Sequence, residues 1–193
     1  MYVVLNSSYF PTINYFRCLQ SFSTIYIDLF EQYQRHSNRN RTTILGANGT
    51  ILLTVPINKK SKTIMKDVKI ADQEWQKKHI MSIQSAYGSA PFFIHYFEDI
   101  KQLINSKCTY LVDLNTIIIN YFINQLDIKN PIKHTNKYQK SYPHNYMDLR
   151  DKININNNNK TYHQIFGEKF LSNLSIIDLI FNLGPEAKKY ITA

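Results

Sequence analysis

The pattern of apolar and polar positions at the start of the chain predicts a strand, a helix and a second strand. Tyr2 to Leu5 form a short apolar run typical of a buried strand, and residues 13–21 carry apolar positions at helical spacing. Thr24 to Leu29 (TIYIDL) form the second strand. Strand, loop, helix and strand in this order indicate a right-handed parallel βαβ unit. Ligands of such units bind outside the carboxyl ends of the strands, which directs attention to the loop after the first strand.

A different pattern between residues 38 and 57 predicts a β-hairpin. Two runs rich in β-branched residues flank the sequence GANG, which contains the hairpin dipeptide Asn48-Gly49. Pro56 ends the second run, because proline cannot donate to a strand ladder. Residues 67–71 alternate like one more short strand.

Helical periodicity predicts two consecutive helices between Asp72 and Phe97. We expect Asp72 to cap the first helix and Gly88 to end it in the left-handed conformation. Residues at spacings of four, four and three share one face of this helix: Trp75, His79, Ile83 and Ala86.

The rest of the chain alternates between apolar helical segments and one polar stretch. A third helix is predicted over Tyr110 to Leu126, and residues 131–135 are expected to return to the sheet. Residues 136–160, rich in Tyr, Lys, His and Asn, are expected to form an exposed polar loop. Residues 162–166 predict a short helix, and Ser172 is expected to cap the last helical segment.

These elements predict a mixed α/β fold in a single domain over residues 1–193. We expect a short mixed sheet begun by the βαβ unit, together with the hairpin and a helical cluster.

The formal net charge of +9 suggests a negatively charged partner. No run of five Lys or Arg exists, so dispersed solvated charge is the alternative to a focused anion site. Nucleic-acid binding requires a basic face interleaved with aromatics, which residues 137–146 match only weakly, so nucleic acid is not an expected partner. An anionic small molecule is the partner that we expect.

Cysteine and hydropathy patterns add expectations about location. Cys18 and Cys108 lack CxxC spacing and paired histidines, which fits a reducing cytoplasm and predicts neither a metal site nor a cofactor. The most apolar predicted helix is too short and too polar to form a membrane span.

Several motifs in their order along the chain resemble the WbqC-like protein family, in its Bacteroidetes-type branch. They are a YFP loop after the first strand, NRNR before a GANG hairpin that ends in LTVPI, W-x-x-KH with AYGSAPFF, DLN, and a late NLSIIDLIFNLGPEA. This set covers nearly the whole chain. The resemblance implies a role in O-antigen-type surface-polysaccharide biosynthesis, and from it we expect a cytoplasmic group-transfer enzyme that acts on an activated, anionic sugar.

The chain departs from the family pattern at the end of the first strand. Other branches carry a His-Gln-Pro tripeptide where Leu5, Asn6 and Ser7 stand here. A non-catalytic binding or scaffold protein that kept the family fold is therefore the alternative function.

Three polar residues carry the predicted chemistry. An arginine fork such as Arg41 binds phosphate or carboxylate through two N–H groups, and Asn40 beside it orients a sugar hydroxyl or carbonyl. The alternative is a structural ion pair. His79 is the predicted general acid or base, and an interior histidine bound to a backbone carbonyl is its alternative.

The remaining candidates are substrate-binding residues. The strand-end argument places Asn6, Ser7 and Tyr9 at the mouth of the site, with an ordinary capping loop as the alternative. Lys78 and Tyr87 complete the predicted set. The alternatives are that Lys78 is an ordinary solvated lysine and that Tyr87 only packs in the core. All of these assignments require the loop after the first strand, the hairpin and the helix of His79 to line one positively charged cavity.

Overall fold

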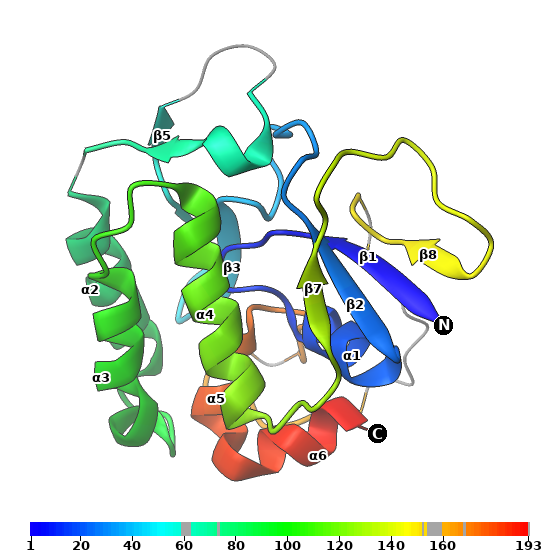
Figure 1. The fold of residues 1–193 in the computed structure, drawn as a ribbon. Coiled ribbons are helices and arrows are strands. Elements are labelled where there is room, and N and C mark those ends of the chain that lie inside the picture. Colours follow the sequence, from blue (N-terminus) through cyan, green and yellow to red (C-terminus); the bar gives the residue numbers. More distant parts are fainter. Residues whose placement is uncertain (59–62, 73, 152, 154–159, 168, 193) are drawn as a thin grey trace.

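The structure is a computed structural model that describes residues 1–58, 63–72, 74–151, 153, 160–167 and 169–192. Its elements form the predicted mixed α/β fold, in which helices pack around a parallel sheet and beside small antiparallel strand pairs (Figure 1).

A four-stranded parallel sheet organises the fold. β1 (Tyr2–Asn6), α1 (Ile13–Ser21) and β2 (Thr24–Asp28) form the predicted βαβ unit. β7 (Ile132–His134) pairs with β2, and β8 (Tyr146–Asp148) pairs with β1, which gives the strand order β7-β2-β1-β8. Because all four strands are parallel, their carboxyl ends meet at one edge of the sheet.

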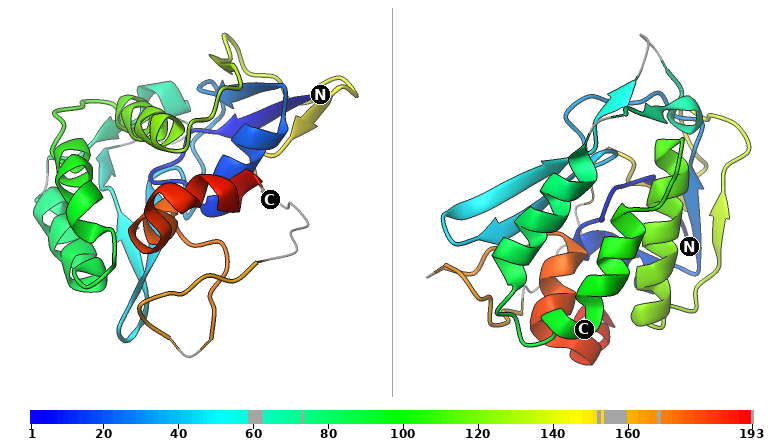
Figure 2. Two further views of the ribbon diagram at one scale, coloured as in Figure 1. Left: turned by 90° about the horizontal axis from the view of Figure 1, so that it is seen from below. Right: turned by 90° about the vertical axis from the view of Figure 1, so that its left-hand side faces the viewer.

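The predicted hairpin forms a separate sheet and does not extend the parallel one. β3 (Arg41–Gly46) and β4 (Gly49–Thr54) pair antiparallel across the GANG turn. Figure 2 shows the hairpin lying beside α2 (Trp75–Tyr87) and away from the four-stranded sheet. A second antiparallel pair joins β5 (Ile57–Asn58) to β6 (Lys69–Ile70), and β6 lies within residues 67–71, where a short strand was predicted.

The other helices pack mainly against one another, against α1 and α2, and against the hairpin. They are η1 (Met65–Asp67), α3 (Phe93–Ile104), α4 (Leu111–Gln125), α5 (Ile176–Leu183), η2 (Gly184–Glu186) and α6 (Ala187–Thr192). In α2 the predicted face is buried through Trp75, His79, Ile83 and Ala86. Among the described residues, no helix is long and apolar enough to cross a bilayer.

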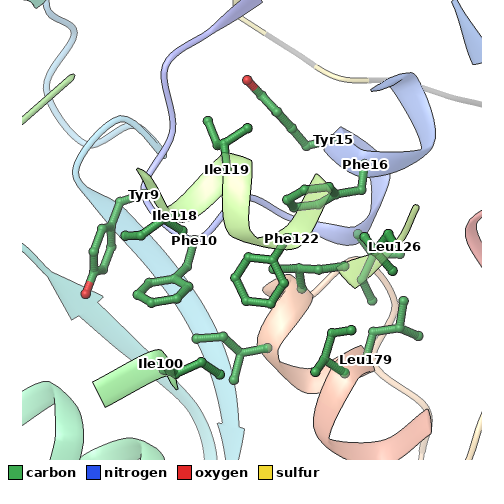
Figure 3. Packing of buried hydrophobic residues seen from close by; sticks show 14 of the residues in the cluster. Tyr9, Phe10, Tyr15, Phe16, Ile100, Ile118, Ile119, Phe122, Leu126 and Leu179 are labelled. Carbon is green, nitrogen blue, oxygen red and sulfur yellow. The ribbon is translucent and has the colours of Figure 1, made fainter. Parts of the chain in front are cut away.

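The hydrophobic core is centred on Phe122 of α4 (Figure 3). The ring of Phe122 meets the rings of Phe10 and Phe16 edge-to-face, with centroid separations of 6.0 and 5.8 Å. Edge-to-face contact aligns the positive ring edge with the negative ring face, which stabilises the cluster beyond its buried area. This core fixes the loop after β1 against α4.

Three predictions about helix ends are wrong. α2 begins after Glu74, so Asp72 does not cap it, and Gly88 keeps right-handed angles (φ −56°, ψ −24°). The reason is that the chain continues to turn toward α3, with the amide of Ala90 donating to the carbonyl of Tyr87. The last helical segment is capped by Ser175, whose hydroxyl accepts from the amide of Ile177, and not by Ser172.

Two segments in the C-terminal third also differ from their predictions. Residues 162–166 are not helical, because the extended chain lets Tyr162 and Gln164 both reach the buried carboxylate of Asp178. β8 lies within the segment that was expected to be a polar loop. Its three residues are too few to show a periodic pattern, and pairing with β1 supplies their hydrogen bonds.

Gly184 is the glycine that its surroundings require most strictly. It has a φ of 52°, and a Cβ at this position would lie 2.4 Å from the ring of Phe92. Gly184→Ala is therefore expected to lower the free energy of unfolding by about 2–4 kcal/mol, from backbone strain and overpacking together. Urea denaturation measures this loss.

Gly49→Ala is the matched control, because Gly49 also has a positive φ but its Cβ would meet nothing within 4 Å. We expect a smaller loss from this variant. Equal losses from the two variants would show that the Phe92 contact has no energetic role.

Candidate functional site

A cavity of about 470 Å³ lies at the carboxyl edge of the parallel sheet. Its wall includes Asn6 at the end of β1, residues 34–39 from the loop after β2, and residues 149–151 directly after β8. From β1 the chain crosses to β2 on one side, whereas β8 flanks β1 on the other, so the strand order changes direction here. Parallel sheets bind ligands at such switch points. We call this the carboxyl-end cavity.

A second cavity of about 310 Å³ adjoins the first. The two cavities share Gln34, Arg150 and Asp151 as lining residues. Tyr33 and Tyr138 line only the second one, so a ligand that extends past Arg150 meets aromatic side chains there.

Arg150 forms a buried clamp between two strand ends. Its Nη1 donates to Asp28 Oδ2 at 2.7 Å, and its Nε donates to Asp148 Oδ1 at 2.9 Å. The rings of Tyr138 and Tyr142 lie 5.4 and 5.2 Å from the guanidinium carbon, within cation–π range. The positive charge of Arg150 is therefore already compensated by protein carboxylates.

Arg39 is neutralised in the same way. Its side chain is 1% exposed, and its Nε donates to Glu31 Oε1 at 2.8 Å while Nη2 pairs with Glu31 Oε2. Burial raises the pKa of Glu31, and the hydrogen bond and charge of Arg39 oppose this rise. The carboxylate of Asp151 lies 3.9 Å from Arg39 Nη2.

Arg35, His36 and Arg41 are basic residues at the surface of this region. Arg35 and His36 are exposed and line the carboxyl-end cavity. His36 has a backbone φ of 56°, in the left-handed region that residues other than glycine rarely adopt. Its Nδ1 lies 2.9 Å from Arg41 Nη1 and must accept this hydrogen bond, because arginine has only donors. Arg41 thus reaches the cavity through His36.

The loop after β1 is held from several sides. Asn6 lines the cavity, and its Oδ1 accepts from the Ser8 hydroxyl at 3.0 Å. Phe10 is buried with a φ of 38°, and the hydroxyls of Thr42 and Ser175 donate to its carbonyl at 2.7 and 3.1 Å. Such a conformation persists only where its surroundings fix it, so the loop is a rigid part of the site.

Asn115 in the DLN motif connects this loop to the segment of Arg39. Its Nδ2 donates to the Ser7 hydroxyl at 3.1 Å and to the carbonyl of Arg39 at 2.9 Å. Ser7 is only 1% exposed, so it supports the wall of the cavity from behind.

The side chains of Tyr9, His79 and Asn40 are buried and make hydrogen bonds inside the protein. His79 Nε2 donates to the carbonyl of Thr54 at 3.2 Å, so its Nδ1 accepts from the Tyr9 hydroxyl at 2.9 Å. Asn40 Nδ2 donates to the carbonyl of Val55 at 2.7 Å. These contacts join the first loop, the hairpin and α2, and none of the three side chains lines the carboxyl-end cavity.

Lys78 and Tyr87 lie apart from the cavity. Lys78 is exposed on α2. The Tyr87 hydroxyl accepts from the amide of Leu45 at 3.1 Å and donates to Asp178 Oδ1 at 2.9 Å. The described residues contain no group of three His, Cys, Asp or Glu side chains that is arranged to hold a metal ion.

Of the predicted site residues, the structure thus brings Asn6 and, through His36, Arg41 to the cavity. Arg35 and His36 were not predicted, because a single basic residue in a polar loop has no recognisable pattern. The catalytic role of His79 stays a prediction, and its two internal hydrogen bonds favour the alternative of an interior histidine.

The burial of His79 has a consequence for stability. Burial lowers its pKa to about 4, although the hydrogen bond to Thr54 opposes this change. The unfolded chain, with an ordinary pKa near 6.5, then binds the proton more readily. The stabilising contribution is therefore complete above about pH 6.5 and is lost as the pH falls toward 4, by about 3 kcal/mol in total.

Urea denaturation at pH 7 and at pH 4.5 tests this expectation. The wild type should lose more stability between the two values than His79→Gln, which has no imidazole to protonate. The same loss in both proteins would assign the acid sensitivity to other groups.

The fold and the cavity together define an α/β protein with a ligand-sized cavity at the carboxyl edge of a parallel sheet. The WbqC-like protein family matches residues 6–157 and 142–190, and the chain belongs to that family. It is 25% identical to the "Uncharacterized protein Rv1507c" of Mycobacterium tuberculosis (strain ATCC 25618 / H37Rv) over 223 aligned positions, which cover 97% of this chain and 96% of that protein. No solved structure matches the chain.

Proposed function

We propose that this protein is a cytoplasmic group-transfer enzyme of surface-polysaccharide biosynthesis that binds an activated, anionic sugar in the carboxyl-end cavity. The supporting observation is the position of the cavity at the switch point of the sheet, beside exposed basic residues. The biosynthetic setting rests on the family resemblance.

In this proposal the anion is bound by the exposed basic side chains and not by the buried arginines. Arg39 and Arg150 already pair with carboxylates, whereas Arg35 and His36 line the cavity without an acidic partner among the contacts of the described residues. Arg41 Nε is buried and has no hydrogen-bond partner in the described part of the chain. A phosphate at the cavity mouth would accept hydrogen bonds from Arg35, from His36 and from the Nη atoms of Arg41, whereas the buried Nε of Arg41 is out of its reach.

The size of the site suits an activated sugar. The two adjoining cavities, about 470 and 310 Å³, lie within the range of pockets that hold small molecules. Asn6 presents an amide beside the cations, and Tyr33 and Tyr138 line the adjoining part. The phosphate would lie near His36 and the ring of the donor near the two tyrosines.

We assign the proton transfer to His36 and not to His79. His36 is exposed at the cavity, and its hydrogen bond from Arg41 leaves Nε2 as the protonated nitrogen of the neutral ring. Both nitrogens of His79 are already bonded inside the protein. An acid or base must reach the reacting atom, and exposure at the cavity meets this requirement.

The second candidate function is a non-catalytic binding protein. It is favoured by the family resemblance, which implies that Leu5, Asn6 and Ser7 stand where other branches carry His-Gln-Pro, and Asn6 lines the cavity. Both functions require binding of an anionic ligand, and only turnover separates them.

The test uses UDP-glucose and other nucleotide sugars as probes, with calorimetry for binding and product analysis for turnover. Arg41→Ala is expected to weaken binding by about ten- to a hundredfold, the effect of a lost charge-assisted hydrogen bond. His36→Gln should keep most of the binding but lower turnover by about a hundredfold or more.

Lys78→Ala is the matched control, because it removes an exposed cation outside the cavity. An equal loss of affinity in this control, or no binding by the wild type, would reject the carboxyl-end site. Binding of a probe without turnover of any nucleotide sugar would support the second candidate.

A further inference from the structure

A third cavity, of about 290 Å³, lies under the connection between β7 and β8. β7 and β8 are the two outer strands of the sheet and run parallel to each other. Residues 135–145 must therefore return from the carboxyl end of β7 to the amino end of β8. This connection and the strand residues Tyr26 and Tyr146 enclose the space. The cavity shares no lining residue with the two cavities at the carboxyl edge. We call it the connection cavity.

One part of its wall is aromatic. The rings of Tyr142 and Tyr146 are 5.5 Å apart with 30° between their planes, and the ring of Tyr26 lies 5.7 Å from that of Tyr146. All three tyrosines are half-buried. Tyr2 packs against Tyr146 at 4.8 Å but does not line the cavity, so it supports the aromatic wall from outside.

The other part of the wall offers neutral hydrogen-bonding groups. Asn136 and Gln139 contribute amides, which can donate and accept at the same time. The cavity is lined by no carboxylate among the described residues, and Lys137 and His134 are its basic groups.

The hydroxyl of Tyr142 is the least satisfied group here. It is buried and has no hydrogen-bond partner in the described part of the chain. Burial raises the pKa of Tyr142 to about 12, so the hydroxyl keeps its proton and can donate. Buried polar groups are rarely left without a partner, and a molecule bound in the cavity that Tyr142 lines could supply the missing one.

We infer that the connection cavity binds one neutral pyranose ring, such as a hexose or an N-acetylhexosamine. Apolar C–H faces of the sugar pack on the tyrosine rings, while its hydroxyls bond to the amides and to Tyr142. The volume lies at the lower limit for small-molecule pockets, which suits a single ring and excludes a complete nucleotide sugar. This site is independent of the activated-sugar site proposed above.

Saturation-transfer NMR with the full chain tests the inference. The probes are the methyl glycosides of glucose, galactose and N-acetylglucosamine, with uridine, a nucleoside with a planar base and no pyranose ring, as the competitor. At least one glycoside should bind with a millimolar Kd. Tyr142→Phe, which removes only the hydroxyl, and Gln139→Ala should each weaken that binding by about two- to tenfold, as expected for one lost hydrogen bond.

Two neighbouring residues provide the controls. Tyr2→Phe removes a hydroxyl from a tyrosine outside the connection cavity. Lys140→Ala changes a residue that lines the second cavity described above, and not the connection cavity. Neither should change glycoside binding. The inference is overturned if no glycoside binds at tens of millimolar, if uridine alone binds, or if the control variants reduce binding as much as Tyr142→Phe.

Discussion

Replacing Arg39 with methionine is expected to lower the free energy of unfolding by about 3–5 kcal/mol. The substitution leaves the carboxylate of Glu31, 5% exposed, without the arginine that donates to both of its oxygens. An uncompensated buried charge is strongly destabilising, because the protein interior solvates it poorly. Urea denaturation at pH 7 measures the loss.

A double variant separates charge from packing in this pair. Glu31→Gln with Arg39→Met removes both charges, so it should be more stable than Arg39→Met alone. Arg35→Met removes an exposed arginine from the same cavity and should change stability by about 0.5 kcal/mol or less. A loss from Arg39→Met no larger than that of Arg35→Met would mean that the Glu31 pair contributes nothing to stability.

Arg150→Met is expected to have an effect of similar size, about 3–5 kcal/mol. Asp28 is fully buried and would keep its hydrogen bonds from the amide of Phe30 and the hydroxyl of Thr135, but would lose its only arginine partner among the described residues. The loss should be concentrated at β8, because Arg150 joins the end of this strand to β2.

Hydrogen exchange provides the local measurement for Arg150. The amide of Leu149 donates to the carbonyl of Val4 at 2.9 Å, and its protection should decrease much more in Arg150→Met than that of amides in α4. A uniform decrease over the whole protein would contradict the assignment of Arg150 as a clamp for β8.

The parts of the fold that were predicted correctly have strong local patterns. The βαβ unit, the GANG hairpin, the buried face of α2 and the helix α4 follow from periodicity and turn chemistry within a few residues. β8 was missed because three residues cannot show a period, and their place in the sheet depends on pairing with β1, far away in the sequence.

The candidate site was only partly predictable for the same reason. Asn6 followed from the rule that ligands bind at strand ends, which needs only the first strand. The roles of Arg39 and Arg150 depend on which acid each one meets, and Arg150 meets Asp28 across 122 positions of sequence. His79 lies on an apolar helical stripe, and this position indicated burial more strongly than the presence of a histidine indicated catalysis.

A map of where a nucleotide sugar binds is the most direct test of the central claim. In the ¹⁵N-labelled protein titrated with UDP-glucose, we expect the largest amide shift changes at Asn6, residues 34–39 and residues 149–151. Changes centred on α2 around His79, or no change at the carboxyl edge of the sheet, would contradict the account.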